Sequence, residues 1–271
     1  MRRHLKSKLL FLCALSLLSA GCSEVPISGR QQFNIVPGST MNSLSFKSYG
    51  EFLAQNKLST NAEQTQMVKR VGGRIQKAVE NYSAENGYED RLDGYEWEFN
   101  LVEDPNVNAW AMPGGKVVVY TGILPIAQGE TGLAVVMGHE IAHAFVKHGA
   151  ERMSQGLLVQ MGGIALSTAL EDYPDQTKDL FMQSYGVGAQ VGVLLPYSRK
   201  HESEADHLGL VFMAMAGYNP EQAPAFWERM AAQKKGAAGP EFLSTHPADQ
   251  TRIQNLKDLL PEAMTYYRRT Q

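Results

Sequence analysis

The stretch His139-Glu140-Ile141-Ala142-His143 lies inside a mostly apolar run, residues 131–148, whose pattern predicts a buried helix. Two histidines four residues apart on a helix share one face and can hold a single metal ion. Neutral imidazole is a good zinc ligand, and the neighbouring glutamate can accept a proton from water. Unpaired polar groups are costly in a buried helix, and a metal would satisfy all three. We therefore predict His139 and His143 as zinc ligands and Glu140 as the catalytic base.

A third ligand is predicted on a second helix, further along the chain. Ser198 is a good N-cap, and Gly217 with Pro220 is a good stop, so together they bound this helix. Glu202 and Asp206 are four residues apart on it and face the same way. We predict Glu202 as the third ligand of one zinc per chain, and Asp206 as the acceptor for the free ring N–H of a ligand histidine. A solvated acidic face is the alternative for both.

Four other polar side chains near these motifs are expected to lie outside the site. Glu204 points away from Glu202 on their helix, so we expect it on a solvated face. His201 and His207 are expected at the surface. His148 follows His143 by more than one helical turn, and we expect it to lie away from the metal.

Two further segments complete a family pattern: residues 108–115 (Asn-Ala-Trp-Ala-Met-Pro-Gly-Gly) and residues 244–247 (Ser-Thr-His-Pro). With His139–His143 and Glu202–Asp206 they make residues 63–260 resemble a family of zinc metalloendopeptidases. That family includes the type-I CAAX prenyl endopeptidase, the mitochondrial Oma-type protease and bacterial periplasmic lipoprotein proteases. The resemblance implies a gluzincin-type α+β fold, mostly helical, with a small β-sheet or hairpin beside the metal-binding helix.

The resemblance also implies a role for His246, either as a transition-state stabiliser or as a group that approaches the metal. From the sequence alone, His246 could simply precede a helix that Pro247 opens at its first turn.

A β-hairpin is predicted from Asn108–Met112 and Lys116–Tyr120, which Pro113-Gly114-Gly115 joins. Upstream, residues 95–101 alternate apolar and polar side chains, a pattern typical of a half-buried strand. An extended peptide can add itself to an edge strand and present one carbonyl to a nearby metal. Asn108–Met112 is the candidate edge, and a purely structural hairpin is the alternative.

Several helices are expected around these elements. The apolar stripe of residues 63–80 predicts an amphipathic helix, weakened in the middle by Gly72-Gly73. Further helices are expected near 44–54, over 220–233 and over 247–260. For residues 156–195 we expect a helical excursion over the active site, with two ordinary core helices as the alternative.

The first 21 residues are predicted to be a lipoprotein signal peptide. A basic start precedes an apolar run of 12 residues, Leu9–Ala20, which is too short to span a bilayer. Leu18-Ser19-Ala20-Gly21-Cys22 resembles a bacterial lipobox. Cys13 would be removed with the signal, which leaves Cys22 without a disulfide partner, and a lipid thioether explains such a cysteine. An ordinary signal peptide is the alternative.

These features predict three parts: the signal peptide over 1–21, a tether and N-terminal wrapping segment over 22–62, and a zinc metallopeptidase domain over 63–271. Ser23 stands where an aspartate typically retains lipoproteins at the inner membrane. We therefore expect an outer-membrane lipoprotein that faces the periplasm, bound to the membrane through lipidated Cys22.

The charge balance bears on the partners. Residues 1–21 hold four basic and no acidic residues, so their removal leaves 21 basic against 28 acidic residues, a net charge of −7. Nucleic acid is therefore not expected as a partner. The expected substrates are unfolded or misassembled envelope proteins, whose peptide bonds the enzyme would hydrolyse. The alternative function is that of a chaperone or assembly factor for outer-membrane proteins, with weak or conditional proteolysis.

Overall fold

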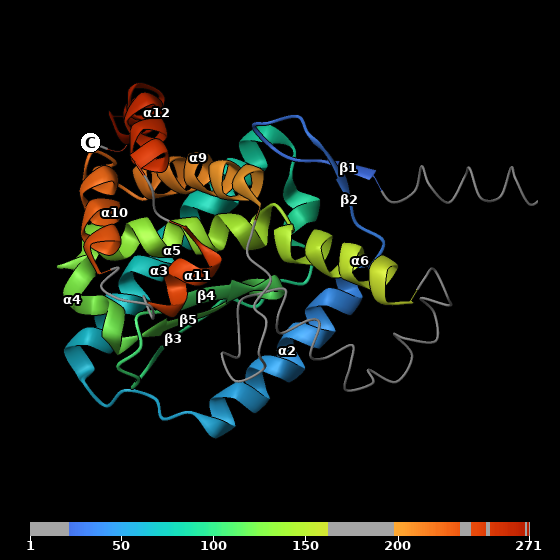
Figure 1. Cartoon of the computed structure of the whole chain (residues 1–271), viewed down its shortest axis with the longest axis horizontal. Helices are drawn as coiled ribbons and strands as arrows, with labels where there is room; N and C mark the ends of the chain where they lie inside the picture. The colour runs from blue at the N-terminus through green and yellow to red at the C-terminus, as the bar shows by residue number, and fades with distance from the viewer. Residues whose placement is uncertain (1–21, 162–197, 234–239, 248–249, 269, 271) are drawn as a thin grey trace, which may run out of the picture.

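The computed structural model describes residues 22–161, 198–233, 240–247, 250–268 and 270. The predicted signal peptide and most of the predicted excursion over 156–195 lie outside these residues. The described chain is α+β and mostly helical, as predicted (Figure 1).

A three-stranded sheet carries the predicted hairpin. Its strands are β3 (Glu98–Val102), β4 (Ala109–Met112) and β5 (Lys116–Tyr120), in the order β3-β5-β4. β5 runs parallel to β3 and antiparallel to β4, with Met112 opposite Lys116. Gly114 and Gly115 in the connecting turn have φ of 76° and 79°, a conformation that glycine adopts at low cost. The predicted edge strand, β4, does lie at an edge of this sheet.

The metal-binding motifs lie on two helices that cross closely. α5 (Glu130–Phe145) runs between the sheet and α9 (Arg199–Met215), with α3 (Ala62–Asn86) packed alongside (Figure 1). A Cβ atom on Gly138 would lie 2.9 Å from the carbonyl oxygen of Gly209, and one on Gly209 would lie 3.0 Å from the backbone of His139. Only glycines allow this approach, which brings the two motifs together.

The predicted boundaries of these helices are largely confirmed. Ser198 caps α9 by accepting a hydrogen bond from the backbone N–H of His201, and Gly217 follows its end with φ of 77°. α3 passes through Gly72 without a break. Gly72 is required there because a Cβ atom would lie 2.3 Å from the ring of Phe99.

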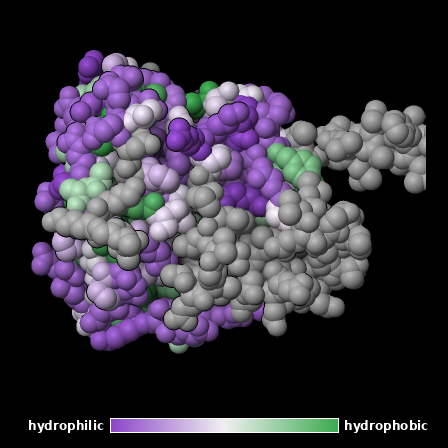
Figure 2. Space-filling model, viewed as in Figure 1, coloured by the Kyte–Doolittle hydropathy of each residue, from purple (hydrophilic) through white to green (hydrophobic). Residues whose placement is uncertain are grey.

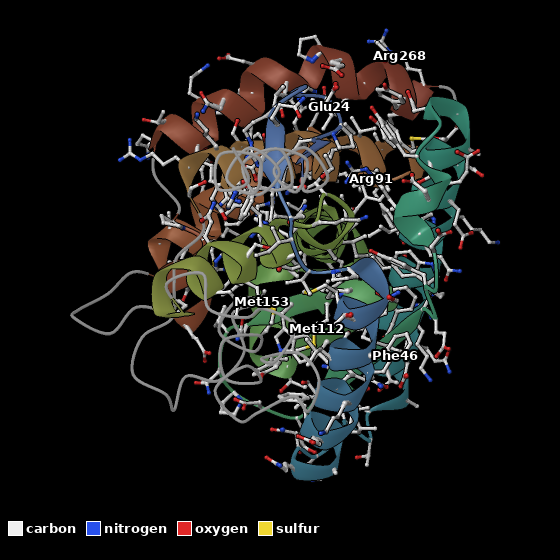
Figure 3. The ribbon with its side chains drawn as sticks, turned by 90° about the vertical axis from the view of Figure 1, so that its right-hand side faces the viewer. Glu24, Phe46, Arg91, Met112, Met153 and Arg268 are labelled. Atoms are coloured by element: carbon white, nitrogen blue, oxygen red, sulfur yellow. The ribbon has the colours of Figure 1, made fainter. Side chains whose placement is uncertain are left out.

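The remaining helices enclose this centre. α2 (Gly38–Gln55) is longer than the predicted helix and packs with β4 and α6 (His148–Met161) around a second apolar cluster that contains Met112 and Met153 (Figure 3). The predicted C-terminal helices correspond to α10 (Gln222–Ala232) and α12 (Gln250–Arg268). The shorter elements are α4 (Leu124–Ala127), α11 (Glu241–Thr245), and the 3-10 turns η1 (Glu89–Leu92), η2 (Pro113–Gly115) and η3 (Thr121–Ile123).

The start of the predicted tether is a packed hairpin. β1 (Cys22–Glu24) and β2 (Gln31–Phe33) pair antiparallel beside α6 (Figure 1). Val25 and Gln32 are fully buried. Arg91 of η1 donates a hydrogen bond to the carbonyl oxygen of Glu24, and the two residues lie near one another in Figure 3.

The described surface in Figure 2 is mainly hydrophilic, with small hydrophobic patches. Among the described helices, none has the length and apolar character needed to cross a membrane.

Candidate metal centre

Four buried side chains from three parts of the chain meet at one point. His139 and His143 come from α5, Glu202 from the first turn of α9, and His246 from the residue that ends α11. Each offers a donor atom, and these atoms lie within 4.8 Å of one another. The structure thus brings together the three predicted ligands and His246.

The separations between the donors fit a tetrahedral zinc site. The Nε2 atom of His139 lies 3.1 Å from Nε2 of His143, 3.2 Å from Nδ1 of His246 and 3.5 Å from Oε2 of Glu202. The Nε2 atom of His143 lies 3.3 Å from Oε1 of Glu202. Ligands at zinc-bonding distance in a tetrahedron lie about 3.3–3.6 Å apart. Three imidazoles and one carboxylate, at nearly that spacing, form a donor set suited to zinc.

Asp206 lies where the sequence placed it, behind His139. Its Oδ1 atom is 3.0 Å from Nδ1 of His139, the ring nitrogen that faces away from His143. Burial and Arg252 lower the pKa of His139, but contacts with Asp206 and Glu202 outweigh them and raise it to about 9. Asp206 therefore holds the ring with Nε2 directed at the donor cluster.

Arg252 on α12 was missed by the sequence analysis. Its guanidinium binds both oxygens of Asp206, at 2.9 and 2.7 Å, and lies 2.9 Å from Oε2 of Glu202. The guanidinium also stacks over the ring of Trp227, 3.3 Å from its centroid. The sequence did hold a signal for such a cation, because Glu202 and Asp206 were both predicted to face a buried site and buried charges need a partner.

Glu140 has the properties of a general base. It is 3 % exposed, and within the described residues its Oε1 atom accepts no hydrogen bond, although Nε2 of His246 is 3.5 Å away. Burial raises the pKa of Glu140 above its ordinary value. A carboxylate with a raised pKa accepts a proton more readily, which suits it to activate water.

Two predictions about neighbouring residues are wrong, because His201 and Glu204 are buried rather than solvated. His148 lies outside the donor group, as expected, but it is buried and contacts His143. Lys147 adopts a left-handed conformation, with φ of 61°, so the chain turns back after α5 and His148 returns to His143. Burial lowers the pKa of His148 to about 4, so its ring is neutral at pH 7.

Glu204 is buried beneath the N-terminal hairpin, whereas His201 stacks on His148 and contacts Glu151 of α6 at 3.1 Å. Glu204 binds Arg30 and Ser28, from the turn between β1 and β2. His207 lies at the surface, as expected, and pairs with Glu262 at 2.9 Å.

Comparison with known proteins agrees with this geometry. The model of peptidase family M48 matches residues 69–260, more than half of the chain. The mitochondrial metalloendopeptidase OMA1 of Schizosaccharomyces pombe is 36% identical over 243 residues, which cover 88% of this chain and 66% of that protein. OMA1 of Saccharomyces cerevisiae is 32% identical over 272 residues, with 93% and 75% covered.

A bacterial relative is more distant. The putative beta-barrel assembly-enhancing protease of Vibrio cholerae is 31% identical over 168 residues, 59% of this chain and 34% of that protein. All four donor residues and Glu140 lie inside the region that the family model matches. Since a match of that extent contains a buried donor cluster with its base, the chain belongs to peptidase family M48 and is a metalloendopeptidase.

Proposed function

We propose that this chain is a zinc endopeptidase of the bacterial cell envelope that hydrolyses unfolded or misassembled envelope proteins. It would act from the periplasmic face of the outer membrane, anchored through lipidated Cys22. The observation that carries the chemistry is that Oε1 of Glu140 accepts no hydrogen bond from the described residues and lies beside four donors spaced for zinc. The envelope location is supported by the lipobox-like sequence before Cys22 and by relatives named for β-barrel assembly.

The site residues have separate tasks in hydrolysis. Zinc, when bound, would lower the pKa of a water molecule and polarise the substrate carbonyl. Glu140 accepts the proton of the attacking water on its free oxygen and passes it to the leaving amine. His139, His143 and Glu202 would hold the metal, and Asp206 keeps His139 in the tautomer that can bind it.

The edge strand gives the substrate a place to bind. β4 pairs with β5 on one side only among the described strands, and it packs against α5, which carries His139 and Glu140. An extended peptide that adds to this edge is held through main-chain hydrogen bonds and runs past the metal-binding helix. Recognition through the main chain suits unfolded clients of varied sequence.

With a metal bound, His246 would complete a four-donor arrangement and leave no position for water. A catalytic zinc commonly has three protein ligands and an open fourth position. Nδ1 of His246 would take that fourth place, because it lies 3.2 Å from Nε2 of His139 and 2.9 Å from Oε1 of Glu202. Hydrolysis would therefore require His246 to withdraw from the position it has here, in which its Nε2 atom lies 3.5 Å from Oε1 of Glu140.

The four-donor arrangement together with the edge strand favours a second candidate function, that of a chaperone or assembly factor. A closed site beside a strand edge can bind an extended client without cutting it. The names of the bacterial relatives, which describe assembly-enhancing proteases, support both functions for this chain.

Digestion of an unfolded protein substrate distinguishes the two functions. The purified chain, Glu140→Gln and a chelator-treated sample would be incubated with one reduced, unfolded substrate, and its fragments followed with time. The proposal predicts fragments from the wild type alone. Binding without fragments by the wild type, at full zinc occupancy, would support the chaperone function instead.

A further inference from the structure

The second ring nitrogen of His143 contacts another histidine. With Nε2 directed at the donor cluster, Nδ1 of His143 lies 2.9 Å from Nδ1 of His148. The opposite nitrogen of His148, Nε2, lies 2.8 Å from Oε2 of Glu204. Both residues are buried, and His148 is fully so.

This contact defines the tautomers of both rings. A histidine that binds a metal through Nε2 carries its proton on Nδ1. His143 then donates from Nδ1 to Nδ1 of His148, which must carry its own proton on Nε2 and donate it to Glu204. One chain of hydrogen bonds thus leads from the metal ligand to a buried carboxylate.

The carboxylate of Glu204 is fixed from the N-terminal hairpin. Arg30 reaches both of its oxygens, at 2.8 and 3.0 Å, and the hydroxyl of Ser28 donates to it at 2.6 Å. Arg30 is itself held by two contacts with Glu151 of α6, at 2.7 and 2.9 Å. A buried carboxylate with this many partners remains ionised and has one orientation.

The two histidine ligands therefore have equivalent support. Asp206 orients His139 directly, whereas Glu204 orients His143 through an intervening ring. We propose that His148, Glu204 and Arg30 form a positioning relay that fixes the tautomer and direction of the His143 ring. The relay would thereby set the metal affinity, and it rests on the metal site proposed above. The relay makes docking of the N-terminal hairpin part of the metal site, although none of the described residues before 139 belongs to the donor group.

Two substitutions of His148 separate positioning from packing. The side-chain oxygen of asparagine can lie where Nδ1 of His148 lies, so His148→Asn keeps an acceptor for His143 and loses the contact with Glu204. The amide nitrogen of glutamine can lie where Nε2 lies, so His148→Gln keeps a donor to Glu204 and loses the acceptor for His143. Glutamine also fills more of the space of the His148 ring than asparagine does. If His148 served only in packing, His148→Gln would therefore reduce zinc affinity less than His148→Asn.

The test measures zinc affinity on the metal-free full chain by competition with a chromophoric chelator at pH 7.5. His148→Gln is expected to weaken zinc binding by roughly ten- to a hundred-fold, the usual effect of losing a hydrogen-bond partner of a metal ligand. His148→Asn is expected to weaken it less. Zinc affinity in His148→Gln equal to or higher than in His148→Asn would overturn the proposal.

Arg30→Gln provides a second test of the relay if the His148 variants do not fold. It is expected to weaken zinc binding by a smaller factor, and an unchanged affinity would count against the relay. Glu130→Gln is the matched control. Glu130 begins α5 and pairs with Arg70 at 2.9 Å, away from the donors. The zinc affinity of this variant should therefore equal that of the wild type.

Thermal unfolding of each metal-free variant shows whether a change in affinity only follows a loss of fold. If the wild type itself binds no stoichiometric zinc, the proposed metal site fails. If the wild type binds zinc and the relay variants bind it equally well, the positioning relay alone fails.

Discussion

At the scale of single residues, the proposed proton transfer depends on Glu140. Its amide analogue has nearly the same shape, so Glu140→Gln should keep the fold and the metal, but an amide cannot accept a proton at neutral pH. General-base catalysis typically contributes about a hundred- to ten-thousand-fold, and we expect a loss near the upper end because this carboxylate also delivers the proton to the amine. Initial rates of cleavage at equal zinc content measure the effect. A variant that cleaves as fast as the wild type would show that another site is responsible.

His246 is the donor whose removal should help catalysis. His246→Ala leaves the three remaining donors, His139, His143 and Glu202, and frees the position that water must occupy. We expect zinc to bind more weakly but the cleavage rate, at saturating zinc, to equal or exceed that of the wild type. A rate reduced more than tenfold would instead assign His246 to stabilisation of the transition state.

At the scale of secondary-structure elements, the crossing of α5 and α9 determines whether the donors meet. A methyl group on Gly209 would press on the backbone of His139, so Gly209→Ala must separate the helices. Overpacking of this kind costs about 1–3 kcal/mol of the free energy of unfolding. We expect that loss in denaturant titrations, together with weaker zinc binding.

Gly73→Ala provides the control for that substitution. Gly73 lies within α3 with open space where a Cβ atom would be, so alanine should stabilise the helix by roughly 0.5–1 kcal/mol and leave zinc binding unchanged. Zinc affinity that is equal in Gly209→Ala and Gly73→Ala would show that the crossing does not set the donor geometry.

The attachment of the N-terminal hairpin to α6 should depend on pH through Glu151. Burial raises the pKa of Glu151, but contacts with His201, Arg30 and Gln32 outweigh it and lower the pKa to about 2. A carboxyl whose pKa is depressed in the folded state stabilises that state above its unfolded pKa, near 4.5, and loses this contribution as pH falls toward 2.

Glu151→Gln cannot titrate, so it isolates this contribution. The wild type should unfold at higher denaturant than the variant at pH 7, and the difference should shrink as pH falls from about 5 to 3. Chemical denaturation of the two metal-free proteins at a series of pH values measures it. A difference that stays constant over this range would exclude Glu151 as the titrating group.

Local sequence patterns predicted the parts of the site that depend on local geometry. A helix places His139 and His143 on one face wherever it lies, and the same holds for Glu202 and Asp206. The cap at Ser198 and the glycines of the β4–β5 turn are likewise local signals. These patterns were sufficient to predict that His139, His143 and Glu202 lie together and that β4 is an edge strand, whereas the ligand and base roles stay predictions.

Long-range contacts account for what the sequence did not predict. His148 follows His143 closely, but the left-handed turn at Lys147 redirects it, and nothing in the spacing required that turn. Arg30 and Glu204 are 174 positions apart, so only the folded chain shows that they pair. Arg252 was missed for the same reason, since it lies on α12 and neutralises carboxylates of α9.

At the scale of the whole molecule, the proposed anchor is a single residue. Cys22→Ala removes the thiol that would carry the lipid and leaves the signal sequence before it. Because removal of residues 1–21 would leave a net charge of −7, which disfavours binding to anionic lipid, the acyl chains would provide the attachment. We expect the wild type in the outer-membrane fraction and the variant in the soluble periplasmic fraction. A variant that stays wholly with the membrane would rule out the lipid anchor, whereas inner-membrane recovery of the wild type would refute only the sorting.

The packed start of β1 limits how far such an anchored enzyme can reach. A flexible tether over residues 22–62 could extend on the order of 100 Å, since each extended residue adds up to about 3.6 Å. Instead, β1 begins at Cys22 itself, and Arg91 holds its last residue, Glu24. Because the folded domain would then begin directly at the lipidated residue, the enzyme would stay close to the membrane surface and would not reach far into the periplasm. Its substrates would be protein chains that remain near that surface, within about one diameter of the enzyme from the bilayer.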